Sequence, residues 1–142
     1  MIHAQNNKSV MLLIGSVSNT AVTATFDTVD FKYMQVDVFA PSVAATTTIL
    51  SACKLEESET TTEASMVTWA GSSVTSFAHT TIAASEVSQR FNVNLLGRKR
   101  YMMLEINGAG ASQDMMAQVR LSRAEVFANN ATDANVIYQT TI

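Results

Sequence analysis

The segment Glu86–Leu96 alternates between apolar and polar side chains, and this alternation constrains the fold more than any other feature of the chain. Its odd positions include Val87, Phe91, Val93 and Leu95, whereas its even positions up to 94 are charged residues, serine or asparagine. A period of two residues places successive side chains on opposite faces of a β-strand. We therefore predict a strand with one buried face and one hydrated face.

The composition supports strands in the rest of the chain. Threonine, valine and serine are abundant, and branching at Cβ suits a pleated surface. Only 15% of the 142 residues are charged, against about 25% in an average soluble domain. This composition excludes a disordered chain, which would be rich in proline and charge, and a coiled coil, which would be rich in alanine, glutamate, lysine and leucine.

Three further segments are predicted to be strands. Ala45–Glu57 alternates in the same way as the first segment. Arg100–Ile106 follows that first segment after a short connection containing Gly97, which predicts a hairpin. Phe31–Phe39 is apolar on both sides, which predicts a strand that is either central or covered by a partner chain.

The segment Gln113–Phe127 admits two interpretations. Met115, Ala117 and Val119 alternate with polar residues, as in a strand, and we favour that interpretation. The same residues are good helix formers, and Ser112 or Asp114 could cap a helix. Both possibilities stay open at this point.

We predict an all-β protein built as a jelly-roll-like, mostly antiparallel β-sandwich over residues 9–127. An extended N-terminal arm, 1–8, would precede it, and a C-terminal tail, 128–142, would follow it. Fourteen extended residues span about 46 Å, so such a tail could reach a neighbouring molecule. The alternative is that both ends are disordered. The longest early apolar run, Val10–Ile14, is too short for a membrane-spanning helix, and we interpret it as a strand.

No group of residues points to catalysis. The two histidines, His3 and His79, have no second histidine, cysteine or carboxylate at ligand spacing. Cys53 lies on the apolar side of its strand and is interpreted as a small core residue. The acidic run 56–63 is interpreted as a solvated loop, with weak Ca²⁺ binding as a minor alternative. We therefore expect no catalytic residue, no metal and no cofactor, and an enzyme is the least favoured function.

The net charge of −3 does not provide the basic field that nucleic-acid binding requires, so no nucleic-acid partner is expected. One basic cluster is present, Arg98, Lys99 and Arg100. On a turn, these residues could contact a carboxylate of a partner, because arginine matches that group in shape. A solubilising turn is the equally weighted alternative.

Three stretches in this order carry a family resemblance. They are Phe26–Phe31, Cys53–Ser58 and Leu96–Tyr101, the last leading into Met102–Ile106. Together they resemble small tailed-bacteriophage head proteins that decorate or cement the capsid. In that family an acidic Glu-Glu-Ser-type turn follows one strand, and a Gly-basic-Arg-Tyr turn opens a later one. The resemblance covers residues 26–127. The Thr-rich turn at 60–62 departs from the family pattern, where Asp and Gly are more common.

The resemblance implies a β-sandwich protein, often trimeric, on the outside of an icosahedral shell. Such a protein would bridge major capsid subunits and resist the pressure of packaged DNA. We therefore expect the major capsid protein and further copies of the chain, a homotrimer by preference, as partners. No membrane partner is expected. The expected location is the outer surface of the virion.

The expected partner interface combines the two ends with the basic cluster. Its residues are Gln5, Asn6, Asn7, Arg98, Lys99, Arg100, Val136, Ile137 and Tyr138. The second candidate function is a virion-surface or tail-fibre-like β-sandwich that binds carbohydrate. That function predicts a groove with stacked aromatic rings, and the aromatic content of 7% counts against it.

Overall fold

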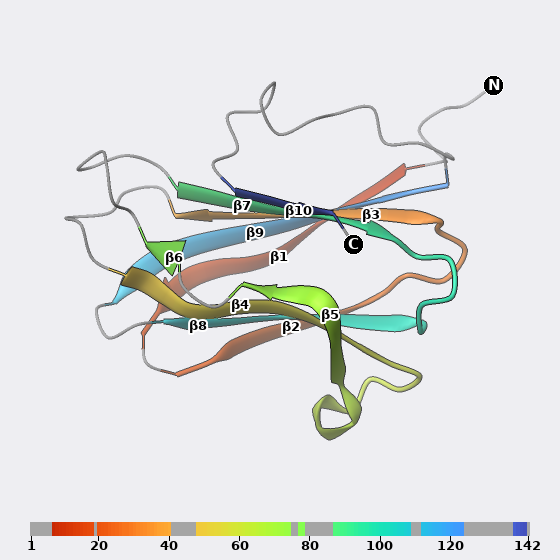
Figure 1. Ribbon diagram of the computed structural model, residues 1–142, viewed down its shortest axis with the longest axis horizontal. Helices are drawn as coiled ribbons and strands as arrows, with labels where there is room; N and C mark the ends of the chain where they lie inside the picture. Colours follow the sequence, from red (N-terminus) through yellow and green to blue (C-terminus); the bar gives the residue numbers. More distant parts are fainter. Residues whose placement is uncertain are drawn as a thin grey trace.

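The computed structural model describes residues 7–18, 20–40, 48–74, 77–78, 87–108, 112–123 and 138–141. Most of these residues lie in strands, and the strands form two sheets that face each other across an apolar interior (Figure 1). The prediction of an all-β sandwich is confirmed.

Each sheet has a defined strand order. The first sheet has the order β1-β9-β3-β7-β10, and its strands are β1 (Asn7–Val17), β9 (Gln113–Ser122), β3 (Tyr33–Ala40), β7 (Val87–Asn94) and β10 (Tyr138–Thr141). The second sheet has the order β2-β8-β4-β5, with β6 also paired to β4. Its strands are β2 (Val22–Asp27), β8 (Tyr101–Gly108), β4 (Thr48–Ser58), β5 (Val67–Val74) and β6 (Phe77–Ala78). The 3₁₀-helix η2 (Glu63–Ser65) lies between β4 and β5 and projects from the sandwich (Figure 1).

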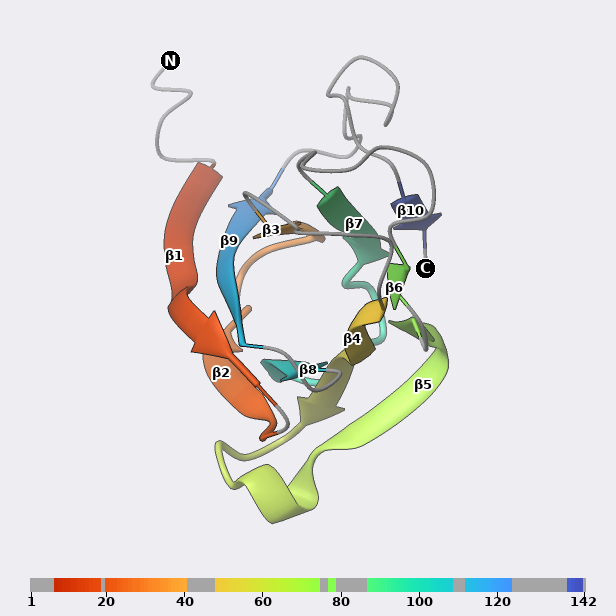
Figure 2. The same ribbon diagram turned by 90° about the vertical axis from the view of Figure 1, so that its left-hand side faces the viewer.

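This strand order is that of a jelly roll when β5 and β6 count as one interrupted strand. The first strand then pairs with the last (β1 with β9), the second with the seventh (β2 with β8), the third with the sixth (β3 with β7) and the fourth with the fifth (β4 with β5). All four pairings are antiparallel. Successive pairs alternate between the two sheets, as expected for a long antiparallel ribbon wrapped around a core (Figure 2). β10 is added outside this scheme and runs parallel to β7.

The interior is formed by the inward-facing residues of both sheets. β3, β7 and β9 contribute from one side, and β4 and β8 from the other. The fully or almost fully buried side chains in this core include Met34, Val36, Val38, Cys53, Leu55, Phe91, Val93, Met102, Leu104, Ile106, Met115, Ala117, Val119 and Leu121. The apolar positions of the alternating pattern predicted for β7, such as Phe91 and Val93, therefore face the core as expected.

The predicted hairpin between the strands now identified as β7 and β8 is wrong, because these strands lie in different sheets. The connection between them turns a corner of the sandwich instead of folding back. On the β7 side, the N–H of Leu95 donates to the carbonyl of Lys32 at 2.8 Å. On the β8 side, the N–H of Thr28 donates to the carbonyl of Arg100 at 3.0 Å. Both anchors lie in the β2–β3 connection, which makes the same crossing. Between them, Gly97 takes a left-handed φ of 79°.

Three further elements settle or change what the sequence predicted: one settles an open choice between strand and helix, and two change the expected arm and tail. Gln113–Ser122 is the strand β9, so the strand interpretation of that segment is correct. β1 begins at Asn7, opposite Ser122, so Asn7 and Lys8 belong to the sheet and not to an arm. β10 lies within the stretch expected to be a C-terminal tail that reaches a neighbouring molecule, and it pairs with the chain's own β7.

Gly108 ends β8 where the turn after β1 passes closest to it. A Cβ atom at this position would lie 2.0 Å from the carbonyl oxygen of Ser18. We expect Gly108→Ala to lower the free energy of unfolding by about 1–3 kcal/mol, because the Ser18 backbone must move to admit the methyl group. Urea denaturation measures this loss.

Gly97→Ala is the control for that experiment. Gly97 has a positive φ, but no atom of the surrounding structure lies within 4 Å of the point that an alanine Cβ would occupy, so only backbone strain opposes alanine there. Its expected cost is about 1 kcal/mol. A Gly108→Ala protein as stable as the wild type would contradict the close approach of β8 to the β1–β2 turn.

Candidate interaction surfaces

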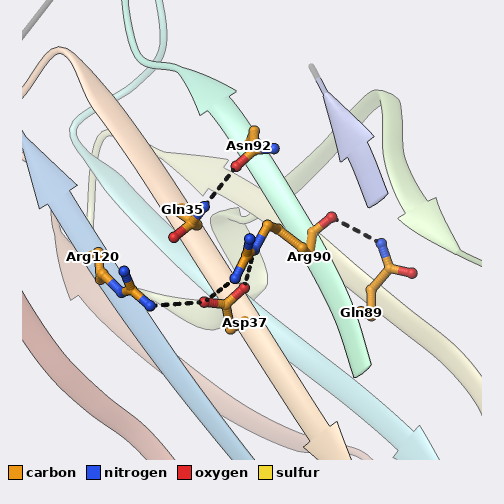
Figure 3. A network of polar contacts seen from close by, with 6 residues as sticks. All are labelled: Gln35, Asp37, Gln89, Arg90, Asn92 and Arg120. Carbon is orange, nitrogen blue, oxygen red and sulfur yellow. Dashed lines mark hydrogen bonds and ion pairs between the residues drawn. The ribbon is translucent and has the colours of Figure 1, made fainter. Parts of the chain in front are cut away.

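A network of polar side chains occupies the outward face of the first sheet (Figure 3). Asp37 of β3 and Arg90 of β7 are directly opposite each other in the antiparallel register. The Nε of Arg90 lies 2.5 Å from one carboxylate oxygen of Asp37, and its Nη2 lies 3.2 Å from the other. Because strand side chains alternate, this pair points away from the core side of Val36 and Phe91. Even so, the exposed fractions are only 4% for the Arg90 side chain and 2% for Asp37.

Amide side chains extend the network along the same two strands. Gln35 and Asn92 are also opposite each other, and the Gln35 Nε2 donates to the Asn92 Oδ1 at 3.1 Å. Gln89 lies on the core side of β7, and its Nε2 donates to the backbone carbonyl of Arg90 at 3.1 Å. Buried polar groups stabilise a structure only when they are paired. The Gln35–Asn92 hydrogen bond meets that condition and ties β3 to β7, whereas the bond of Gln89 lies within β7.

The charge of this network does not balance. Arg120 of β9 approaches the same carboxylate, with its Nη2 3.7 Å from the Asp37 Oδ2. Two guanidinium groups therefore share one carboxylate (Figure 3). The Nη1 of Arg90 is buried and has no hydrogen-bond partner among the described residues. Arg120 differs from Arg90 in that its side chain is 46% exposed. The network thus ends in a positive group that reaches the surface.

Exposed apolar side chains lie beside Arg120. Met116 and Arg120 point outward from β9 on either side of Gln118, and Met11 of β1 is paired with Gln118. The exposed fractions are 47% for Met11 and 37% for Met116. We call Met11, Met116, Gln118 and Arg120 the β1–β9 face. Methionine and arginine are enriched in protein interfaces, so this composition is typical of a docking surface.

The outward face of the second sheet is different, because its cluster has one cation and two anions. Lys54 of β4 contacts Glu56 at 3.0 Å and Glu105 of β8 at 3.1 Å. Burial opposes the charged form of Lys54, but its hydrogen bonds to the two carboxylates outweigh that effect and raise its pKa. This face presents a compact acidic-basic cluster without an excess of positive charge.

The basic cluster predicted from the sequence lies at the corner between β7 and β8, where most of its charge is engaged within the chain. Arg100 makes a bidentate contact with Asp27, with the shortest distance 2.7 Å between Nη2 and Oδ2. The hydrogen bonds from Arg100 hold the pKa of Asp27 below its usual value. Arg98 lies 3.7 Å from Glu57, whose other oxygen accepts the backbone N–H of Lys99 at 3.3 Å.

The arginines of the described chain also cover its aromatic rings. Arg98 lies over Trp69 at 4.7 Å, Arg100 over Tyr101 at 5.0 Å, and Arg123 over Phe31 at 5.4 Å from the ring centroids. Such stacking is a cation–π contact. It occupies one face of each ring, while Trp69 and Phe31 also pack against the core.

The remaining predicted interface residues are at the ends of the chain. Asn7 pairs with Ser122 in the first sheet, and Tyr138 pairs with Gln89. Gln5, Asn6, Val136 and Ile137 lie outside the described residues, as do His3 and His79. Within the described part of the chain, no cluster of three metal-binding side chains occurs, and no helix has the length and apolarity to cross a membrane.

Cys53 is a core residue, as the alternation of its strand predicts. It is fully buried, and burial raises the pKa of its thiol to about 12. Because the thiolate is the reactive species, we expect the native protein to resist a thiol reagent such as dithionitrobenzoate at pH 8. After unfolding in urea, the Cys53 thiol should react with one equivalent of the reagent per chain. Rapid labelling of the native protein would contradict the burial of Cys53.

The polar network was missed by sequence analysis because its members are scattered along the chain. Asp37, Arg90 and Arg120 come from three strands. Arg90 and Arg120 are single charges among polar residues, and Asp37 is a single charge in a segment that is apolar on both sides. Alternation predicts that Arg90 and Arg120 point away from the core, as they do, but it also predicts a hydrated position for Arg90, whose side chain is only 4% exposed. The contact between them depends on strand register, for which these strands carry no local signal.

Comparison with known proteins gives similarity in fold but no sequence family. No family model matches the chain, and no curated protein sequence matches it. Among solved structures, the SPBc2 prophage-derived protein YomS matches with a TM-score of 0.50 and 12% identity, over 82% of this chain and 92% of YomS. The PBSX exported protein XepA matches with a TM-score of 0.52 and 14% identity, over 87% of this chain but only 39% of XepA.

A bacterial adhesin domain has a similar fold. The K3 cleaved adhesin domain of Lys-gingipain from Porphyromonas gingivalis matches with a TM-score of 0.51 and 14% identity, over 77% of this chain and 74% of that domain. At such identities the likeness concerns the fold alone. The chain therefore shares its β-sandwich with two phage-derived proteins and with an adhesin domain.

Proposed function

We propose that this protein is a structural component of a phage virion that binds the outside of the capsid and holds neighbouring major capsid subunits together, without catalysing a reaction. The β1–β9 face is the observation that carries the proposal. It places two exposed methionines and a half-exposed arginine on one sheet surface, next to a buried ionic network. The fold shared with the prophage-derived YomS and with the PBSX protein XepA supports a phage origin.

The internal bracing of the sandwich suits this role. A protein that bridges shell subunits must transmit force between its contact surfaces without deforming. Here β3 and β7 are joined by the buried Asp37–Arg90 pair, and the corner is joined by Arg100 and Asp27. These contacts link strands that are distant in sequence, and each braces one sheet: β3 to β7 in the first, and the end of β2 to the start of β8 in the second. We further propose that the protein acts as a homotrimer, in which the terminal segments reach neighbouring copies or shell subunits.

Shell stabilisation provides the direct test. Shells of the parent virus purified without this protein are mixed with it, sedimented, and melted by differential scanning calorimetry. Binding should place the protein in the pellet and raise the melting temperature of the shell, because a ligand that binds only the assembled state stabilises it. An unrelated β-sandwich of similar charge is the control. Absence of co-sedimentation would refute the proposal, and sedimentation equilibrium of the free protein tests the trimer.

A carbohydrate-binding surface module of the virion is the second candidate, favoured by the fold shared with the Lys-gingipain adhesin domain. Trp69 would be its natural stacking platform, but Arg98 lies over that ring. Sugar binding at Trp69 would require Arg98 to move away. A glycan array in which Arg98→Ala gains ligands that the wild type lacks would support this function. No binding by either protein would remove it.

A further inference from the structure

The β1–β9 face has the chemistry of a site for a carboxylate flanked by apolar side chains. Arg120, Gln118 and Met116 occupy successive outward positions of β9, which are about 7 Å apart along a strand. Met11 stands beside Gln118 on the neighbouring strand. The face therefore offers a guanidinium group and two methionine side chains within the reach of a short protein segment.

The charge of the face is not satisfied from within the described chain. The carboxylate of Asp37 already accepts two hydrogen bonds from Arg90, which leaves Arg120 with only a 3.7 Å ion pair. Arg120 therefore retains donors for a bidentate contact with another carboxylate. The buried Nη1 of Arg90 has no hydrogen-bond partner among the described residues, so the network also lacks an acceptor. A negative group placed at Arg120 would balance a network that now has two cations and one anion.

The apolar neighbours define what surrounds that negative group. Met11 and Met116 are two of the exposed large apolar side chains of the described residues. Methionine adapts its shape to a partner, and covering it removes apolar surface from water. Two exposed methionines are poor surroundings for a small hydrated anion. They suit a protein segment that places apolar side chains on both sides of an aspartate or glutamate.

We propose that the β1–β9 face is the surface that docks on the shell, and that it binds a carboxylate-bearing segment of the shell protein through Arg120, with Met11 and Met116 covered by flanking apolar side chains. This inference rests on the proposed function, since it names the surface and the chemistry by which the chain holds its partner. It departs from the expectation that the basic corner makes that contact, because Arg98 and Arg100 are paired with carboxylates of their own chain.

Charge reversal on two surfaces tests the proposal. The wild type, Arg120→Glu and Lys32→Glu are titrated onto shells that lack the protein, and affinity is measured by co-sedimentation. Lys32 is an exposed residue in the β2–β3 connection, and its backbone N–H donates to the carbonyl of Ser122 at the end of β9. It is not a member of the β1–β9 face, so Lys32→Glu gives a matched change in charge beside that face. Arg120→Glu should weaken shell binding by at least about tenfold, as expected when an interfacial charge pair is reversed. Lys32→Glu should bind like the wild type.

A second variant helps to distinguish the loss of a binding contact from misfolding of the protein. Met11→Ser removes an exposed apolar side chain and leaves the ionic network intact, and it should also weaken shell binding. Circular dichroism and thermal melting establish that each variant is folded. Sedimentation equilibrium of each free variant, carried out in parallel, reports self-association.

The outcomes separate this inference from the proposed function. If the wild type binds shells and both Arg120→Glu and Met11→Ser bind equally well, the docking surface is elsewhere and only the inference fails. Equal losses for Arg120→Glu and Lys32→Glu would also overturn it, because they would indicate unspecific attraction. A change in self-association with unchanged shell binding would assign the face to a second copy of the chain instead. If the wild type does not bind shells, the proposed function fails and the inference fails with it.

Discussion

Asp37→Ala is expected to lower the free energy of unfolding by about 3–5 kcal/mol, because it leaves the guanidinium of Arg90 buried without its carboxylate. The exposed fraction of the Arg90 side chain is 4%, so water cannot replace the lost partner without opening the sheet. Arg120, which also faces Asp37, would then add repulsion between two cations. Equilibrium urea denaturation followed by circular dichroism measures the loss.

Two controls separate the cost of an unpaired charge from the value of the pair itself. Removing both partners in Asp37→Leu with Arg90→Met should recover most of the stability, because buried ion pairs are often replaceable by apolar residues of similar volume. Asp27→Ala removes the carboxylate of an exposed pair, where the Arg100 side chain is 50% exposed. Its expected cost is at most about 1 kcal/mol. A loss below that value for Asp37→Ala would contradict the buried network.

The corner pair also gives a pH dependence with a defined sign. The pKa of Asp27 is lower in the folded protein because Arg100 donates hydrogen bonds to its carboxylate. The stabilisation by this pair is therefore present above the unfolded-state pKa of Asp27 and is lost as the pH falls through its folded-state pKa. Because the pair is exposed, the effect is small and decreases with added salt.

Strands were predictable from this sequence, whereas their pairing was not. The alternation around Phe91 depends only on side chains two residues apart, and the apolar face of β7 lies in the core as predicted. The predicted hydrated face is wrong at Arg90 and Asn92, which are buried. Whether β7 and β8 form a hairpin depends on groups far along the chain. Leu95 is bound to the carbonyl of Lys32, and the carbonyl of Arg100 is bound to Thr28. Those contacts turn a short connection into a crossing between sheets, and no local pattern indicates them.

The residues of the candidate site were likewise only partly predictable from the sequence. A run of three basic residues is conspicuous in a sequence, so Arg98, Lys99 and Arg100 were obvious candidates. The side chains of Arg98 and Arg100 are paired with carboxylates that lie more than forty residues away in the sequence. Arg120 stands alone in the sequence, and only the register of β9 against β3 brings it to Asp37. Isolated charges on hydrated strand faces are ordinary, so the sequence contains no sign that Arg120 lies at the exposed end of a buried network.

This arrangement suggests a physical advantage of the low charge of the chain, which is a small cost of desolvation on docking. Association is less favourable when charged groups must lose their bound water on contact with a partner. On the described β1–β9 face, Arg120 is the one charged member, and its neighbours are two methionines and a glutamine. Docking would therefore desolvate a single guanidinium while covering apolar surface. A single positive charge can also fix the orientation of a partner, since only one position on the face favours a carboxylate.

Phe91→Ala is expected to destabilise the protein by about 3–5 kcal/mol, the usual cost of deleting a buried phenylalanine ring. Phe91 is fully buried in the central part of the first sheet, where it pairs with Val36 of β3 and with Thr140 of β10. Truncation would leave a cavity between the two sheets that the flanking strands cannot close without breaking their register. Urea denaturation of the purified variant gives the change in free energy.

Leu96→Ala is the matched control, because it truncates an apolar residue only five positions further along the chain. Leu96 is 66% exposed, since the period of two ends at Leu95 and the chain turns the corner. Its loss should change the free energy of unfolding by about 0.5 kcal/mol or less. Comparable losses for the two variants would mean that Leu96 is buried in solution by an additional contact. The corner would then join the β1–β9 face as an interface, and Leu96→Ala should weaken self-association or shell binding.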